Sequence, residues 1–121
     1  MPENINTIGK TYERPWGTYK TLALEDGYQI KTITVNPKGR LSLQKHTQRR
    51  EHWLIIKGSL MITVGNEIKN YEVGDKIFID KEIMHRAENI TNTPATIVEV
   101  QLGSYLGEDD IIRLEDVYGR S

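Results

Sequence analysis

The chain has 121 residues and carries 16 Lys and Arg against 17 Asp and Glu, so its formal net charge is −1. This length predicts one domain with a core of its own, and the balanced charge excludes the broad basic surface of a nucleic-acid-binding protein. The chain has no cysteine, which excludes disulfides and thiolate metal sites and favours an intracellular protein.

Residues 1–25 are expected to form an N-terminal arm. The opening stretch MPENINTIGK is polar and lacks the apolar segment of a signal peptide, and no apolar run elsewhere reaches the ~20 residues that cross a bilayer. We therefore expect a cytoplasmic protein that does not associate with membranes. Pro15 and Gly17 interrupt regular structure, and Trp16 is expected to pack on the barrel.

Residues 26–103 consist of short β-branched runs separated by Gly and Asn. The runs are YQIKTITV, HWLIIK, LMITV, IKNYEV, KIFI and ATIVEVQL. Such runs, without an amphipathic period of helical length, predict an all-β sandwich or barrel. Gly65 and Asn66 are expected to turn a hairpin, because both tolerate positive φ. In the first run the apolar positions change phase between Ile30 and Ile33, which predicts either a bulge or a strand buried on both faces.

A concentration of polar side chains, SLQKHTQRREHW, lies between two of the predicted strands. Side chains two residues apart on a strand share a face, so Gln44 and His46 point the same way, and Glu51 can return to that side after a turn. Far along the chain, His85 follows a predicted strand and a turn. Two imidazoles, a carboxylate and an amide oxygen are a suitable ligand set for one divalent ion, with Zn²⁺, Mn²⁺, Co²⁺, Ni²⁺ and Fe²⁺ all open.

Each of these side chains also has an ordinary structural interpretation. A single histidine on a strand is more often structural than a ligand, and Gln44 can hydrogen-bond substrate or a metal-bound water instead of the metal. His52 follows Glu51 directly and should therefore face the opposite side. Trp53 has the parity of Glu51, which places it either on the wall of a cavity or in a plain apolar core.

Two sets of residues at fixed spacing resemble the motifs of the cupin superfamily. The first motif has a His-x-His pair, then a Glu and a Gly, and the matching positions are Gln44, His46, Glu51 and Gly58. Glutamine thus stands where the motif has its first histidine. The second motif is matched in its Gly, His and Asn by Gly74, His85 and Asn89, whereas Asp80 and Glu82 stand where it has Pro and Gly. The resemblance implies a double-stranded β-helix, which is a jelly-roll-like barrel.

A closer resemblance is to the type II phosphomannose isomerase domain, usually the C-terminal half of bifunctional mannose-6-phosphate isomerase/mannose-1-phosphate guanylyltransferases. The similar stretches cover nearly the whole chain after Arg14 and are RPWGTY, LSLQKHTQRREHW, HRAEN and EVQLGSYLGEDDIIRLEDVYGR. The family often has three successive histidines where this chain has His46, Thr47 and Gln48, so substrate specificity can differ here. No Gly-rich phosphate loop opens the chain, so we do not expect guanylyltransferase activity.

The resemblance implies a metal-dependent isomerase that interconverts mannose 6-phosphate and fructose 6-phosphate, acting without the guanylyltransferase domain in GDP-mannose and polysaccharide biosynthesis. Such a reaction needs a proton-transfer group, positive charge for the enediolate oxygens and a cation for the phosphate. The implied metal ligands are Gln44, His46, Glu51 and His85. The implied catalytic residues are Glu99 and Arg49, and the implied substrate-binding residues are Arg49, Arg86, Gln101 and Trp53.

Alternatives remain at several of these positions. Paired arginines such as Arg49 and Arg50 are often a solvated turn, Arg86 can be a surface ion pair, and the Glu99 and Gln101 face of its strand can be solvent-exposed. The acidic GEDD stretch is interpreted as a solvated turn, within a charged segment, residues 104–121, that forms either a short helix or an extended arm.

Two rival functions stay open. One is an isomerase or epimerase for another sugar phosphate or nucleotide sugar, because a fold alone does not fix chemistry. The other is a sugar-binding cupin without catalysis, which the residues Gln44 and Thr47 favour. Small cupin barrels commonly form dimers, and an exposed strand edge needs a cover, so we expect a homodimer. The expected ligand is a small sugar phosphate.

Overall fold

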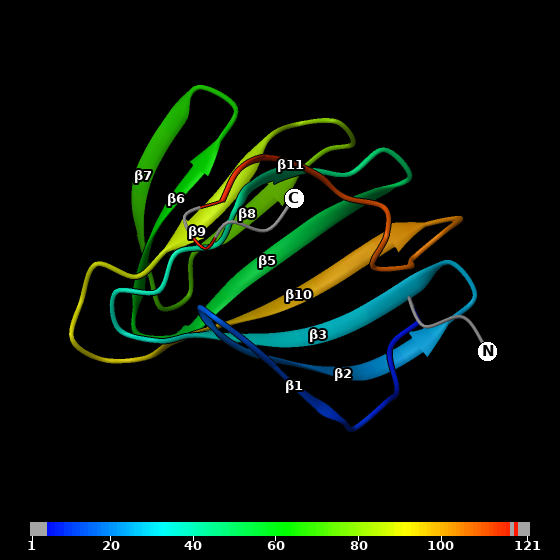
Figure 1. Ribbon diagram of the computed structural model, residues 1–121, viewed down its shortest axis with the longest axis horizontal. Coiled ribbons are helices and arrows are strands. Elements are labelled where there is room, and N and C mark those ends of the chain that lie inside the picture. The colour runs from blue at the N-terminus through cyan, green and yellow to red at the C-terminus, as the bar shows by residue number, and fades with distance from the viewer. Residues whose placement is uncertain (1–4, 117, 119–121) are drawn as a thin grey trace.

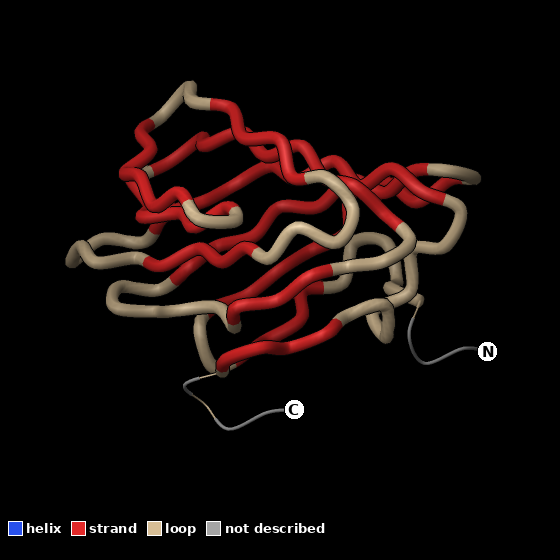
Figure 2. Tube along the Cα trace, turned by 90° about the horizontal axis from the view of Figure 1, so that it is seen from above, coloured by secondary structure: helices blue, strands red, loops and turns tan. Residues whose placement is uncertain are grey.

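The computed structural model describes residues 5–116 and 118, and the regular structure in this part of the chain is all β (Figure 2). The strands are β1 (Thr11–Arg14), β2 (Gly17–Glu25), β3 (Tyr28–Val35), β4 (Leu43–Lys45), β5 (Arg49–Lys57), β6 (Ser59–Val64), β7 (Glu67–Glu72), β8 (Lys76–Ile79), β9 (His85–Glu88), β10 (Ala95–Gly103) and β11 (Ile112–Glu115). Within the described residues there is no helix with the length and apolarity to span a membrane.

The strands form two sheets that face each other as a sandwich (Figure 1). The larger sheet has six strands in the order β1-β2-β3-β10-β5-β8, and the smaller sheet has five in the order β11-β4-β9-β6-β7. All strand pairs within the sheets are antiparallel. The prediction of an all-β, jelly-roll-like barrel is therefore confirmed. Because β10 lies between β3 and β5, side chains far apart in the sequence become neighbours on one face.

The phase change in YQIKTITV has a different cause from the two that the sequence predicted. Along β3 buried side chains alternate strictly with less buried ones, and the buried positions are Gln29, Lys31, Ile33 and Val35. The apolar pattern breaks because two of these buried side chains are polar. A bulge does occur beside this strand, on β2, where the register with β3 shifts between Thr21 and Ala23.

Both terminal segments are parts of the sheets. Residues 11–25, which were expected to belong to an arm, form β1 and β2 at one edge of the larger sheet, where they cover β3. At the other end, β11 pairs with β4 in the smaller sheet. Within the segment 104–121, residues 112–115 are therefore extended and residues 104–111 form a loop, with residues 117 and 119–121 outside the described part.

An apolar core fills the space between the sheets. Its buried members are Trp16, Tyr19, Ile33, Val35, Leu41, Trp53, Ile55, Leu60, Ile62, Ile77, Ile79, Ala87, Ala95 and Ile97. Trp16 packs against the barrel as predicted. The predicted hairpin is also present, because β6 and β7 pair around Gly65, whose φ is 59°.

Candidate metal centre and its cavity

Three buried side chains from distant parts of the chain converge between the sheets. Glu51 lies on β5, His85 begins β9, and His46 directly follows β4. The Nε2 atom of His46 is 3.4 Å from one Glu51 carboxylate oxygen, and the Nε2 atom of His85 is 3.8 Å from the other. The candidate ligand atoms of the three residues all lie within 4.8 Å of one another. The structure thus brings together three of the four predicted ligands.

Main-chain carbonyls orient both imidazoles. The Nδ1 atom of His46 is 2.6 Å from the carbonyl oxygen of Asp110, and the Nδ1 atom of His85 is 2.9 Å from that of Ile83. A proton on each Nδ1 makes these hydrogen bonds and leaves each Nε2 lone pair facing the centre. Burial, followed by the charges of Arg49 and His85, lowers the pKa of His46 to about 3, so this imidazole is neutral. Metal-binding histidines typically have this arrangement, so the donor set fits a divalent ion.

Gln44, the fourth predicted ligand, lies directly opposite His85 in the register of β4 and β9 and lines the cavity. Its amide nitrogen is 3.4 Å from the main-chain oxygen of Ser42 and 3.1 Å from the Ser42 hydroxyl oxygen. An amide nitrogen only donates, so the amide oxygen is the Gln44 atom suited to a cation. Ligation by Gln44 stays a prediction.

Arg49 lies against the same centre. Its Nε donates to a Glu51 carboxylate oxygen at 2.8 Å, and its Nη2 is 3.3 Å from the Nε2 atom of His46. The Nη1 atom of this buried guanidinium has no hydrogen-bond partner among the described residues. Arg50 is exposed, so the pair of arginines divides into one cavity residue and one solvated residue.

Two buried carboxylates share one donor beside this centre. The indole Nε1 of Trp53 lies 3.0 Å from a Glu51 oxygen and 3.1 Å from a Glu99 oxygen. Burial disfavours the charged form of Glu51, but the Arg49 guanidinium and other donors outweigh it and hold the pKa of Glu51 below its usual range. Burial and the charge of Glu51 raise the pKa of Glu99. An ionised carboxylate therefore lies beside one that holds its proton more tightly, a pairing suited to proton transfer.

Gln101 lies behind Glu99 and not on the cavity wall. Its amide nitrogen donates to Glu99 at 2.8 Å, and its amide oxygen accepts from Gln29 at 2.8 Å. The side chain is fully buried. The expected inward direction of Glu99 and Gln101 is thus observed. Gln101 is not among the residues that line the cavity, and its contact with substrate stays a prediction.

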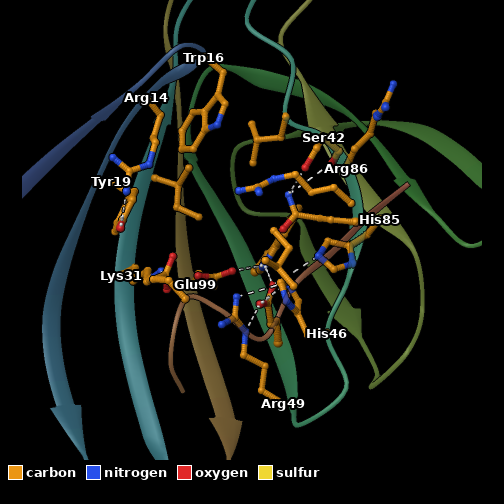
Figure 3. A pocket seen from close by; sticks show the side chains of 18 residues that line it. Arg14, Trp16, Tyr19, Lys31, Ser42, His46, Arg49, His85, Arg86 and Glu99 are labelled. Carbon is orange, nitrogen blue, oxygen red and sulfur yellow. Dashed lines mark hydrogen bonds and ion pairs between the residues drawn. The ribbon is translucent and has the colours of Figure 1, made fainter. Parts of the chain in front are cut away.

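A cavity between the sheets opens beside the three candidate ligands (Figure 3). Trp53, Glu99 and Arg86 line it, as do side chains that the sequence did not single out, namely Arg14, Tyr19, Lys31, Ser42 and Glu108. The described lining residues include five Lys or Arg and three Glu, whereas the chain as a whole has a net charge of −1. Positive charge is therefore concentrated at this cavity, which suits an anionic ligand.

Asp110 contradicts the interpretation of GEDD as a solvated turn, since it is only 7% exposed. Its carboxylate accepts hydrogen bonds from the main-chain nitrogen and hydroxyl of Thr47, at 2.9 and 3.0 Å, and from the main-chain nitrogen of Gln48, at 2.9 Å. Asp110 therefore holds the loop that presents His46, and the Thr47 hydroxyl is engaged with it. No local pattern marks this role, because the partners are 62 and 63 positions away.

Solved structures share this fold. An uncharacterized conserved protein with a double-stranded β-helix domain from Klebsiella pneumoniae has a TM-score of 0.71 at 16% identity, covering 93% of this chain and 90% of that one. An RmlC-like cupin from Shewanella frigidimarina has a TM-score of 0.69 at 14% identity, covering 80% and 88%. At such identities the likeness establishes the cupin fold alone.

Sequence relatives identify the family. The xanthan biosynthesis protein XanB of Xanthomonas campestris is 44% identical over 108 residues, which are 89% of this chain and 23% of that protein. The mannose-1-phosphate guanylyltransferase ManC of Salmonella typhimurium is 42% identical over 107 residues, 88% of this chain and 22% of that protein. The chain thus spans less than a quarter of either relative. The family described as mannose-6-phosphate isomerase C-terminal matches residues 3–116, and the chain therefore belongs to this family of isomerase C-terminal domains.

Proposed function

We propose that the chain is a metal-dependent isomerase that interconverts mannose 6-phosphate and fructose 6-phosphate, and that these residues suffice without a guanylyltransferase domain. One observation carries the proposal: His46, His85 and Glu51 meet beside the Glu99 carboxyl in a cavity with excess positive charge. Family membership supports a sugar phosphate as the ligand.

One divalent ion would be held by His46, Glu51 and His85, with the amide oxygen of Gln44 as a fourth ligand. Nitrogen and oxygen donors without sulfur fit Zn²⁺, Mn²⁺, Co²⁺, Ni²⁺ or Fe²⁺. When bound, such an ion supplies Lewis-acid stabilisation of the negative charge that develops on the sugar oxygens O1 and O2.

Glu99 is the proton-transfer residue in this proposal. Its carboxylate takes the proton from C2 of the open-chain aldose, the C2–H electron pair forms the C1–C2 double bond of an enediolate, and the aldehyde oxygen takes up the negative charge. Return of the proton to C1, with transfer of the O2 proton to O1, completes the ketose, which has a hydroxyl at C1 and a carbonyl at C2. The raised pKa of Glu99 suits both directions of transfer near neutral pH.

Two arginines support the substrate. Arg49 places its unpartnered Nη1 atom beside the candidate metal ligands, where it donates to a sugar oxygen as charge develops there. Arg86 lines the cavity next to His85 in sequence and adds positive charge to the wall. Trp53, which lines the cavity, supports the reaction by donating its indole N–H to both carboxylates.

Metal analysis followed by a coupled assay of mannose 6-phosphate conversion tests the proposal. We expect about one divalent ion per chain and turnover, both lost in the His46→Ala, His85→Ala double variant. The His52→Ala variant is the matched control, because His52 is exposed on the outer face of β5. Undiminished isomerase activity in the double variant, without metal, would contradict the proposal.

A panel of hexose phosphates and nucleotide sugars separates the rival functions. Bound metal without conversion of mannose 6-phosphate favours an isomerase or epimerase for another of these compounds. Neither metal nor conversion, together with measurable sugar binding, favours a binding module. The homodimer stays a prediction that sedimentation equilibrium tests, and the cytoplasmic location stays one for cell fractionation.

A further inference from the structure

A second polar group lies across the cavity from the candidate metal ligands. Figure 3 shows Arg14, Tyr19 and Lys31 on the side formed by β1, β2 and β3, whereas His46 and His85 lie on the other side. The motif RPWGTY begins with Arg14 and ends with Tyr19. The isomerisation proposed above gives these side chains no task.

Lys31 is a buried cation held by a counter-ion from a loop. It is 4% exposed, and its Nζ lies 2.8 Å from a Glu108 carboxylate oxygen. A buried ammonium requires an opposite charge, because burial removes its hydration. The Glu108 side chain is 31% exposed and belongs to the loop between β10 and β11. Glu108 is therefore the member of the pair that can leave.

A second cation contacts the same tyrosine ring as Lys31. The Nζ of Lys31 is 4.4 Å from the centroid of the Tyr19 ring, and the Cζ of Arg14 is 5.1 Å from the same centroid. Arg14 also donates from Nη2 to the Tyr19 hydroxyl at 3.2 Å. Two cations on one tyrosine, next to a cavity, form a site that a dianion satisfies better than a single carboxylate does.

Strand register sets the distance of this site from the metal ligands. Lys31 lies opposite Glu99 on β10, and Glu99 lies opposite Trp53 on β5. Neighbouring strands are about 4.8 Å apart, so Lys31 is about 10 Å from the strand that carries Glu51. The reacting carbons and the phosphate of a hexose 6-phosphate lie at opposite ends of the sugar. A ligand with its carbonyl end at Glu51 can therefore extend its phosphate toward Lys31.

We propose that Lys31 and Arg14 bind the phosphate group of the substrate, and that Glu108 is the counter-ion that the phosphate displaces. The identity of the ligand as a sugar phosphate rests on the proposed function. Arg86 is a competing cation of the cavity, but Glu115 contacts it twice, through its carboxylate at 2.8 Å and its main-chain oxygen at 3.4 Å. Among the described residues, Lys31 forms an ion pair with Glu108, through one carboxylate oxygen that also accepts a hydrogen bond from Asn6 at 3.2 Å.

A matched pair of variants, Glu108→Gln and Glu115→Gln, tests this assignment. Each removes the carboxylate charge that faces one cavity cation, Lys31 or Arg86. Calorimetric titration of inorganic phosphate into the metal-loaded full chain measures the effect, and phosphate bound at the metal contributes equally to all proteins compared. We expect Glu108→Gln to bind phosphate about ten-fold more tightly and Glu115→Gln to bind like the unaltered chain. Tighter binding in Glu115→Gln alone would place the phosphate at Arg86 and overturn the proposal.

Replacing the cation itself gives an independent measurement. Lys31→Met should raise KM for mannose 6-phosphate about ten-fold or more with kcat and metal content little changed, and Lys31→Arg should restore most of the loss. An unchanged KM in Lys31→Met would overturn the proposal. Because Lys31 is buried, thermal unfolding of Lys31→Met is recorded first. If this variant does not fold, the phosphate affinity of Glu108→Gln decides whether the phosphate binds at Lys31.

The experiments distinguish a failure of the proposed phosphate site from a failure of the proposed isomerase activity. A chain that converts mannose 6-phosphate, with Glu108→Gln and Lys31→Met indistinguishable from it, has the isomerase activity but no phosphate site at Lys31. A chain whose phosphate affinity responds to both variants, but which converts no sugar phosphate, has the site and lacks the reaction.

Discussion

The inner face of the larger sheet has two regions that share the same three strands. The apolar region is a row of side chains at most 7% exposed, Ile33 on β3, Ile97 on β10 and Ile55 on β5. Two residues further along each strand, the same face carries the row Lys31, Glu99 and Trp53, and then the row Gln29, Gln101 and Glu51. The antiparallel ladder runs through both regions, and only the side chains change.

The polar region shows how a small barrel holds charge in its interior. Burying an unpaired polar group is costly, and here the groups supply partners for one another. Trp53 donates to both carboxylates, Arg49 pairs with Glu51, and Gln101 donates to Glu99. The apolar region therefore stabilises the fold, while the polar region keeps donors and charges ready for a ligand.

Removing the central carboxylate should have the largest effect and separate the two regions most clearly. Glu51→Ala should lose bound metal and lower kcat by about a thousand-fold or more, because a metal ion contributes several kcal/mol of transition-state stabilisation. Atomic emission and the coupled assay measure both. The control is His52→Ala, one residue away and on the outer face of β5. Full metal content in Glu51→Ala would show that the centre lies elsewhere.

A cavity in the apolar region should act on stability alone. Ile97→Ala is expected to lower the free energy of unfolding by about 2–5 kcal/mol, because Ile97 is fully buried and its methyl groups leave a void. Urea titration measures this, and kcat of the folded enzyme should stay within a small factor of the original. A loss of kcat comparable to that of Glu51→Ala would show that the regions cannot be separated.

The pH dependence of stability should report the buried carboxyl of the polar region. Burial and the charge of Glu51 raise the pKa of Glu99 from 4.5 to about 7. The folded state therefore binds this proton more tightly than the unfolded state, so this group's contribution to stability is present below about pH 4.5 and is lost as pH rises to about 7. In chelator-treated protein, Glu99→Gln should remove this decline, a change of roughly 3 kcal/mol between pH 4.5 and 8. Identical slopes in both proteins, with exposed Glu67→Gln as the control, would contradict the raised pKa.

The smallest expected effect concerns the residue behind Glu99. Gln101→Leu removes a donor to Glu99 and changes no residue that lines the cavity. We expect kcat to fall about ten-fold, the effect of losing one hydrogen bond, with little change in KM. Steady-state kinetics separate the two constants. A raised KM with unchanged kcat would instead mean that Gln101 contacts the substrate, as its sequence position first indicated.

The sequence predicted well whatever depends on a single strand. Because successive side chains on a strand face opposite sides, the sequence placed Glu51 and Trp53 inside and His52 outside, and the structure agrees. Turn chemistry placed the hairpin at Gly65. Motif spacing also indicated that His46 and His85 would meet, because a family resemblance carries information about contacts that local patterns lack.

Lys31 was missed because its run was judged by apolar phase. The change of phase between Ile30 and Ile33 was the available signal, and it marked a buried polar position instead of a distorted strand. Asp110 was missed for a different reason. Its hydrogen-bond partners belong to a loop more than 60 positions earlier, at Thr47 and Gln48, and an acidic turn is solvated in most proteins.

By itself, then, the sequence determined the β class, the hairpin turn and, on β5, which side chains face inward, because these follow from steric preferences of neighbouring residues. Only the tertiary structure decided which inward side chains touch. The register of β3 and β5 on either side of β10 sets Lys31, Glu99 and Trp53 in one row, and that register results from packing between strands that lie tens of residues apart in the chain.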